Sequence, residues 1–210
     1  MDWLDWHQAY DDPGSSLSLR LGIVRERIGV ALDESGPRTR RVLSLCAGDG
    51  RDLLPMLAAR PHLSPEVLLV ELDPTLARGA AENAAGLGLE AVLVAEADAG
   101  ETAVFADVLP VDLLVLCGIF GNVSEDDIRA TLAAVPAMVA PGGFVLWTRG
   151  AFAEGDLRPS VRQWSREAGL EEVAYDGEPA PYGIGLYRLP AEAAPEFAVV
   201  LPDRLFTFIR

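Results

Sequence analysis

The chain contains no lysine, and all 17 of its basic residues are arginine. This absence excludes Schiff-base chemistry on a lysine, and with it the usual kind of pyridoxal-phosphate enzyme. Cysteine and histidine are also scarce, with two of each. Two cysteines cannot build a disulfide framework or a four-cysteine zinc site, and no group of Cys, His, Asp and Glu has the spacing of metal ligands. We therefore predict no metal site.

Positive charge as a whole is in short supply. The 17 basic residues stand against 32 acidic ones, which gives a net charge of −15 at pH 7. Binding to a phosphate backbone needs clusters of Lys and Arg. The one short basic group, Arg38, Arg40 and Arg41, is expected to be a solvated lead-in to a strand. The composition therefore disfavours a nucleic-acid partner.

Long apolar runs are absent as well. Hydrophobic residues make up 50% of the chain, but no uninterrupted stretch is long enough to span a bilayer. The first residues are acidic and aromatic, not the positively charged start of a secretory signal. We expect no membrane segment and a cytoplasmic protein. The length of 210 residues, without repeats or low-complexity linkers, predicts a single domain over 1–210.

What the sequence does contain is a strand–turn–helix pattern. Residues 42–45 form an apolar run, residues 46–50 are mostly small, and a helical pattern begins at Arg51. Such units hold nucleotide-like ligands in open α/β sheets. Small residues let the backbone approach the ligand, and the free N–H groups that open the next helix favour its negative groups. Taken alone, the pattern is equally typical of a structural turn.

Further predicted strands cover residues 67–71, 91–95, 112–116 and 144–147, and they end in small or acidic residues. Glu71 stands at the distance from the glycine turn that suits an acid accepting hydrogen bonds from ribose hydroxyls. The carboxyl ends of parallel strands meet at one edge of a sheet. The pattern therefore predicts a doubly wound, Rossmann-like α/β sheet with one ligand crevice.

With these motifs the sequence resembles the class I S-adenosylmethionine-dependent methyltransferases, over about residues 41–147. The family's first motif, acid-x-Gly-x-Gly-x-Gly, aligns with the glycine turn, where Ser44 replaces the usual acid and Cys46 the first glycine. Cys-Ala-Gly-Asp-Gly-Arg-Asp (46–52) and Cys-Gly-Ile-Phe-Gly-Asn (117–122) are similar to one subgroup of small bacterial members.

The resemblance implies that S-adenosylmethionine is the cofactor and S-adenosylhomocysteine the product. It places Glu71 on the ribose, Leu72 against the adenine and Asp98 at the adenine-binding position. The acid that Ser44 replaces normally helps to hold the methionine end. The implied cofactor-binding residues are Cys46, Ala47, Gly48, Asp49, Gly50, Glu71, Leu72, Asp98, Ala99, Cys117 and Gly118.

The two cysteines end strands that are neighbours in the doubly wound order, so Cys46 and Cys117 should line the floor of the crevice and be reduced. The alternative is that both are small residues where larger ones would clash. Asn122 and Arg149 lie just past predicted strands, and so near the same crevice.

The resemblance also implies five parallel strands with helices on both faces, followed by an antiparallel strand pair. We predict an N-terminal helical arm over 1–36, a cofactor-binding core over 41–149, and a C-terminal helix and strands over 157–210. The elements predicted outside the core strands are helices at 17–32, 51–59, 74–85, 124–139 and 158–168, and strand-like runs at 171–175, 183–189 and 204–209. Which two of the three runs pair stays open. Pro136 should kink or shorten its helix, and residues 141–143 should form a turn.

The start of the arm carries aromatic and histidine side chains along one helical stripe, namely Trp3, Trp6, His7 and Tyr10. The stripe either shapes an acceptor pocket or only anchors the arm, and it is consistent with a homodimer. His7 and Tyr10 are candidate catalytic residues, without a secure assignment. Arg20 is a candidate for the cofactor carboxylate, whereas His62 is expected at the opposite edge of the sheet.

The favoured interpretation is an enzyme that methylates a small organic molecule by in-line methyl transfer. A nicotinamide-dependent dehydrogenase would need a glycine three residues after Gly50, where Leu53 stands. A catalytically inactive protein of the same fold, acting as a cofactor-binding or partner-binding scaffold, is kept open by Ser44 and Cys46.

Overall fold

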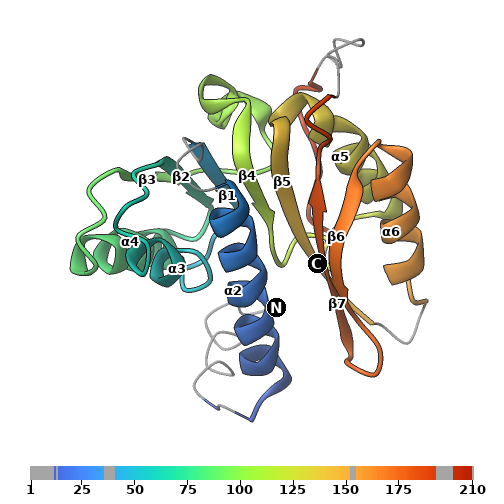
Figure 1. Ribbon diagram of the computed structural model, residues 1–210, viewed down its shortest axis with the longest axis horizontal. Helices are drawn as coiled ribbons and strands as arrows, with labels where there is room; N and C mark the ends of the chain where they lie inside the picture. Colours follow the sequence, from blue (N-terminus) through green and yellow to red (C-terminus); the bar gives the residue numbers. More distant parts are fainter. Residues whose placement is uncertain (1–11, 13, 36–40, 152–154, 193–200, 210) are drawn as a thin grey trace.

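In the computed structural model, residues 12, 14–35, 41–151, 155–192 and 201–209 are described (Figure 1). Their strands form one seven-stranded sheet in the order β3-β2-β1-β4-β5-β7-β6. The strands are β1 (Arg41–Leu45), β2 (Glu66–Glu71), β3 (Val92–Glu96), β4 (Val111–Leu116), β5 (Val139–Gly150), β6 (Glu171–Asp176) and β7 (Tyr182–Arg188). The first five run parallel, and β7 pairs antiparallel with both β5 and β6. The predicted doubly wound sheet is confirmed.

Helices cover both faces of this sheet (Figure 1). They are α2 (Ser16–Ser35), α3 (Leu54–Ala58), α4 (Pro74–Gly86), α5 (Glu125–Met138) and α6 (Arg158–Glu167), with short 3-10 turns η3 (Thr102–Val104) and η4 (Ala106–Val108). The apolar side chains of α2, α3 and α4 share one buried cluster, and those of α5 and α6 share the other. Side chains of β1 alternate between them: Leu43 and Leu45 face α5, whereas Val42 faces α2. The central strands are therefore buried on both faces, as their apolar runs predict.

The C-terminal pair consists of the first two predicted runs, β6 and β7. The third run, residues 204–209, is not a strand of the sheet and makes only two isolated bridges, Glu101 with Arg204 and Val123 with Phe208. Leu205 and Phe206, which are neighbours in sequence, are both buried, whereas Thr207 is exposed, so the run lacks the alternation of a strand with one buried face. These side chains pack against the loops at the carboxyl edge and not against a neighbouring strand.

The first crossover helix is shorter than predicted. Residues 51–53 are turns, and only Leu54–Ala58 is helical. Two carboxylates bind the backbone here: Asp49 accepts from the Arg51 N–H at 3.2 Å, and Asp52 from the Leu53 N–H at 2.8 Å. Such local bonds compete with the helical ones, so the helix begins later.

Two proline-containing segments differ from the predictions. The helix α5 continues two residues past Pro136 to Met138, so the proline does not shorten it, and the alternative of a kink stays a prediction. Residues 141–143 lie inside β5 instead of in a separate turn, at a register shift against β4 between Val111 and Leu113. A bulge absorbs the geometry that the Pro-Gly-Gly sequence requires.

None of the helices within the described ranges is long and apolar enough to cross a membrane. In the same residues, no group of three or more His, Cys, Asp or Glu side chains is placed to hold a metal ion.

One carboxylate joins the last three elements. Glu172 on β6 accepts from the Arg162 guanidinium at 2.9 and 2.7 Å, and from the Tyr187 hydroxyl at 2.6 Å. The bond from Arg162 is the main reason that the pKa of Glu172 lies below its ordinary value of 4.5. The ionised carboxylate therefore stabilises the packing of α6 on β6 and β7.

The substitution Glu172→Gln should lower the free energy of unfolding at pH 7 by about 1 kcal/mol. Because the folded pKa is depressed, this stabilisation is present above the unfolded pKa and is lost as the pH falls through the folded one. The deficit should therefore shrink as the pH falls below the folded pKa of Glu172, where both proteins carry a neutral side chain. Urea unfolding at pH 7 and pH 3 measures it, with the exposed neighbour Glu171→Gln as the control. An equal deficit at both pH values would contradict the assignment.

Candidate functional site

A cavity of about 800 Å³ lies at the carboxyl ends of β1 to β4. All of the predicted cofactor-binding residues line it except Gly50. Gly50 is buried with φ +73°, and a Cβ there would lie 2.6 Å from Leu54 Cδ1. This glycine therefore shapes the turn behind the cavity wall.

The other lining residues come from elements outside the motifs. The helix α2 contributes Leu17, Arg20, Leu21 and Val24, and the end of β5 with the start of β7 contributes Thr148, Gly150, Ala151, Pro181 and Tyr182. Asp52, Asn122 and Phe208 also line the cavity. The lining thus combines strand termini with residues of α2 and of the β5–β7 pair.

The turn after β1 has an unusual backbone. Cys46 has φ +55°, and Gly48 and Gly50 have φ +57° and +73°. The left-handed region costs a residue with a Cβ roughly 1–2 kcal/mol, which glycine avoids. Cys46 is the one described residue other than glycine in this region. It therefore keeps the backbone shape of the glycine that it replaces.

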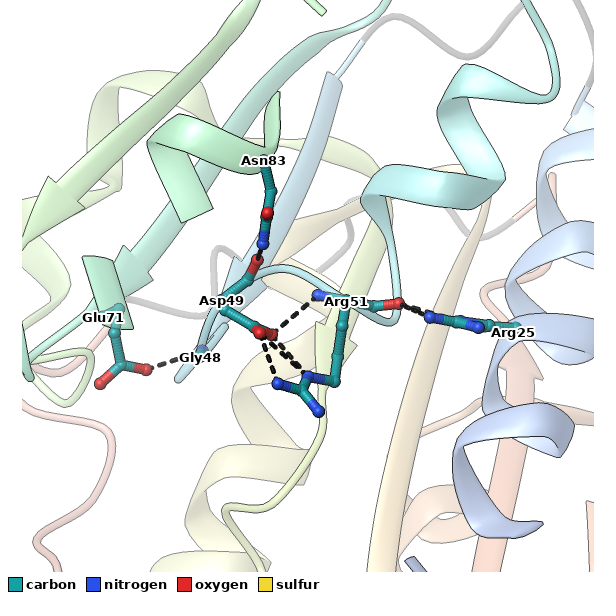
Figure 2. A network of polar contacts seen from close by, with 6 residues as sticks. All are labelled: Arg25, Gly48, Asp49, Arg51, Glu71 and Asn83. Carbon is teal, nitrogen blue, oxygen red and sulfur yellow. Dashed lines mark hydrogen bonds and ion pairs between the residues drawn. The ribbon is translucent and has the colours of Figure 1, made fainter. Parts of the chain in front are cut away.

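Glu71 holds this turn in place (Figure 2). Its carboxylate accepts from the Gly48 N–H at 2.8 Å and from the Asp73 N–H at 2.9 Å. The side chain is only 9% exposed and lies on the cavity wall. A carboxylate has about four acceptor positions, so two backbone bonds leave acceptor capacity for hydroxyl donors.

A second network fixes the turn from outside (Figure 2). Asp49 pairs with Arg51 at 2.6 Å, the Arg51 carbonyl accepts from Arg25 of α2 at 2.6 Å, and the Asn83 amide donates to the Asp49 carbonyl at 3.0 Å. The helices α2 and α4 therefore both hold the turn. The Asp49 carboxylate lines the cavity but is already paired with Arg51.

Asp98 lies across the cavity at the end of β3. It accepts from the Gly100 N–H at 2.8 Å and pairs with Arg204 at 3.0 Å. Leu72, between Asp98 and Glu71 on the lining, is 64% exposed. An apolar side chain left uncovered beside two carboxylates suits a flat, partly apolar ligand.

The two thiols are free and both line the cavity, as predicted. Burial, followed by the charges of Glu71 and Asp98, raises the pKa of Cys46 well above its ordinary value. Burial, followed by the charge of Asp52, does the same for the pKa of Cys117. Both groups are therefore neutral thiols near pH 7.

Asp52 is one of the lining residues that the sequence did not single out, together with Tyr182 and Phe208. Burial raises the pKa of its carboxyl above the ordinary value, with Asp49 adding to the effect. It lies close to Cys117, which is also influenced by the charge of Arg20. Asp52 is the last residue of the 46–52 motif that carries the resemblance, and this position is the sequence feature that could have indicated a role in the site.

The other residues predicted to lie near the crevice differ in whether they line the cavity. Arg20 and Asn122 line the cavity, whereas Ser44 is buried within the sheet and does not. Arg149 is buried and donates to the Phe120 carbonyl, so it supports the loop after β4. His62 is exposed and does not line the cavity.

The stripe of the N-terminal arm, Trp3, Trp6, His7 and Tyr10, lies outside the described residues. The candidate catalytic roles of His7 and Tyr10 therefore stay predictions.

Comparison with known proteins supports the resemblance. Residues 42–143, just under half of the chain, match the family model described as a methyltransferase domain. The resemblance noted from the motifs is thus confirmed. No curated protein matches the chain.

Solved structures agree on the fold of this methyltransferase domain. An O-methyltransferase family protein from Burkholderia thailandensis is similar with a TM-score of 0.65 and 18% identity, over 83% of this chain and 56% of that one. The chain therefore spans little more than half of that protein's length. A 1,6-didemethyltoxoflavin-N1-methyltransferase from the same organism, with 1,6-didemethyltoxoflavin and S-adenosylhomocysteine bound, has a TM-score of 0.60 and 19% identity. The similarity covers 89% of this chain and 86% of that one. An RNA methyltransferase from Salinibacter ruber, in complex with S-adenosylhomocysteine, has a TM-score of 0.53 and 18% identity, over 84% of this chain and 95% of that one.

The thiols allow a test of the cavity that needs no assay of activity. Because burial raises both pKa values, labelling by iodoacetamide should be slow at pH 7.5 and accelerate as the pH rises past 9. Saturating S-adenosylhomocysteine should suppress it, since the sequence has no cysteine outside the cavity. Intact-mass measurement counts the adducts, and the chain in urea gives the unprotected rate. Labelling that the ligand leaves unchanged would show that the cavity is not its site.

Glu71 offers a second test. The substitution Glu71→Gln should raise the Kd for S-adenosylhomocysteine roughly tenfold or more, because a charge-assisted acceptor of hydroxyl and backbone donors is lost. The matched control is Glu96→Gln, since Glu96 is the partner of Glu71 in the β2–β3 register but is exposed and does not line the cavity. Calorimetric titration measures both. Unchanged affinity in Glu71→Gln would remove the ribose role of Glu71.

Proposed function

We propose that the protein is an S-adenosylmethionine-dependent methyltransferase that transfers a methyl group in line to a small organic acceptor. The observation that carries this proposal is the cavity itself. One space brings together the glycine turn, Glu71 and Asp98 at one end and an apolar wall from α2 and β7 at the other.

The residues at the first end fit the cofactor. Ala47 and Gly48 leave room for a close backbone approach, and Glu71 retains acceptor capacity for the two ribose hydroxyls. The uncovered side chain of Leu72 suits one face of the adenine ring, and Asp98 can accept from its amino group. When bound, S-adenosylmethionine supplies a methyl group that is already reactive because it is attached to a sulfonium.

We propose that Asp52 and Arg20 hold the amino-acid end of the cofactor. Both line the cavity near Cys117, and their charges are opposite. An arginine suits the carboxylate and an aspartate suits the ammonium. In this assignment Asp52 takes over the role of the acid that is absent at Ser44, which is buried in the sheet.

Catalysis then rests mainly on orientation. The chain's residues have to place the acceptor atom on the far side of the methyl group from the sulfur, which converts a bimolecular reaction into a positioned one. A general base is required only when the acceptor has to lose a proton. His7 and Tyr10 stay the candidates for that role.

A small, partly apolar acceptor is favoured over a nucleic acid. The second end of the cavity is lined by Leu17, Leu21, Val24, Ala151 and Pro181, with Tyr182 beside them. A volume of about 800 Å³ lies in the upper part of the usual range for small-molecule sites. One structural neighbour is an RNA methyltransferase, but a net charge of −15 opposes a polyanionic substrate here.

The decisive experiment is calorimetric titration with S-adenosylmethionine, S-adenosylhomocysteine and NAD. Micromolar binding of the first two, without binding of NAD, is the expected result and justifies a screen of small aromatic acceptors. Binding of none of them would favour the scaffold interpretation that Ser44 and Cys46 keep open. Binding of NAD alone would overturn the proposal.

The assignment of Asp52 has its own test. The substitution Asp52→Asn keeps an oxygen for the Leu53 N–H but removes the charge. It should weaken S-adenosylhomocysteine about tenfold and leave methylthioadenosine unchanged, because the latter lacks the amino-acid end. Asp126→Asn, at an exposed position of α5, is the control. An equal loss for both ligands would place Asp52 elsewhere in the site.

A further inference from the structure

Residues 201–209, which we call the strap, cross the carboxyl edge of the sheet (red in Figure 1). The strap joins two loops that both line the cavity. The Leu205 N–H donates to the Gly100 carbonyl at 2.8 Å, after β3, and the Ile209 N–H donates to the Asn122 carbonyl at 2.8 Å, after β4. The Thr102 N–H donates to the Asp203 carbonyl at 3.0 Å as well.

Side chains secure the strap along its length. Leu205 and Phe206 are buried in the same core cluster as α5, and the buried Thr131 hydroxyl donates to the Leu205 carbonyl at 3.2 Å. Arg204 pairs with Asp98 at 3.0 Å and also with Glu101. The strap is therefore a packed part of the domain and not a loose tail.

Gly100 makes this close approach feasible. A Cβ on Gly100 would lie 2.4 Å from the Phe206 carbonyl oxygen and 2.9 Å from the Arg204 guanidinium. The first of these atoms is backbone, so any side chain at position 100 would displace the strap. The glycine follows Asp98 and Ala99, which the resemblance places beside the adenine.

The strap ends at the cavity. Phe208 is half-buried on the lining, in contact with the core cluster, and its ring meets Phe206 edge-on with centroids 5.6 Å apart. Its backbone bridges Val123, beyond Asn122. The ring is thus held by Phe206 and by the bridge to the loop after β4, on the wall of the cavity that Asp98 also lines.

We propose that Phe208 is a binding residue for the adenine ring of the cofactor, and that Arg204 and Gly100 position it by docking the strap onto the end of β3. The inference rests on the proposed function, because it assigns one more residue to that site. A rigid aromatic ring presents a π-face to a base without ordering a flexible chain on binding. The adenine would then be enclosed by Leu72, Asp98 and Phe208, two residues from the parallel core and one from the strap.

The test compares two ligands by calorimetry. Phe208→Ala should weaken S-adenosylhomocysteine and methylthioadenosine alike, by about tenfold, because both contain adenine. Phe208→Tyr should keep most of the wild-type affinity, and the affinity of Phe208→Leu should lie between those of Phe208→Ala and Phe208→Tyr. Gly100→Ala should also weaken both ligands, since it lifts the strap. The controls are Ile209→Ala, an exposed side chain on the same strap, and Gly86→Ala, where a Cβ meets no neighbouring atom.

The binding results distinguish failure of the Phe208 assignment from failure of the proposed function. A wild-type protein that binds neither ligand would overturn the proposed function and this inference together. Wild-type binding with unchanged affinity in both Phe208→Ala and Phe208→Leu would overturn the inference alone. A loss confined to S-adenosylhomocysteine would overturn it too, because Phe208 would then border the amino-acid end. If Phe208→Ala unfolds, the comparison of Phe208→Leu with Phe208→Tyr decides.

Discussion

The bond between the Glu71 carboxylate and the Gly48 amide ties together the two strands on which the site is built. The backbone ladder between β1 and β2 ends where the Ala47 N–H donates to the Val70 carbonyl at 3.0 Å. Glu71 extends this connection into the turn, because its carboxylate accepts from the Gly48 N–H at 2.8 Å and from the Asp73 N–H at 2.9 Å. A buried carboxylate needs such donors. The same acid that suits a ribose therefore also shapes the turn that has to admit the ligand.

Two of the carboxylates that line the cavity are neutralised by arginine residues of the protein itself. Asp49 is paired with Arg51, and Asp98 with Arg204, so neither carboxylate depends on a ligand for compensation. Asp52 differs, because burial raises its pKa and the charge of Arg25 offsets this effect only in part. A ligand bearing a positive charge would favour the ionised form of this group. The acids that support the site and the acid that can respond to a ligand are thus different residues.

The sequence predicted the parallel core closely because its signals are local. Apolar runs bounded by small residues predicted four strands within one or two residues and a fifth, β5, that extends further at both ends, and Glu71 and Asp98 at the strand ends lie on one cavity. The strap was predicted only as one of three strand-like runs of which two would pair, because its apolar residues indicate burial but not the partner, and its partners are Gly100 and Asn122, far away in sequence. The late start of α3 was missed for a similar reason, since it depends on where two aspartate side chains bond.

The division of the cavity explains what the motifs can and cannot specify. Strand termini in a parallel sheet have fixed spacing, so motif residues at these termini define a cofactor end in nearly the same way in every such domain. The remaining wall comes from α2 and the β5–β7 pair, whose positions depend on tertiary packing. Tyr182 belongs to this variable wall. Under the proposed function, the acceptor is selected by these elements outside the motifs, and substitutions in them should alter specificity without disturbing the glycine turn.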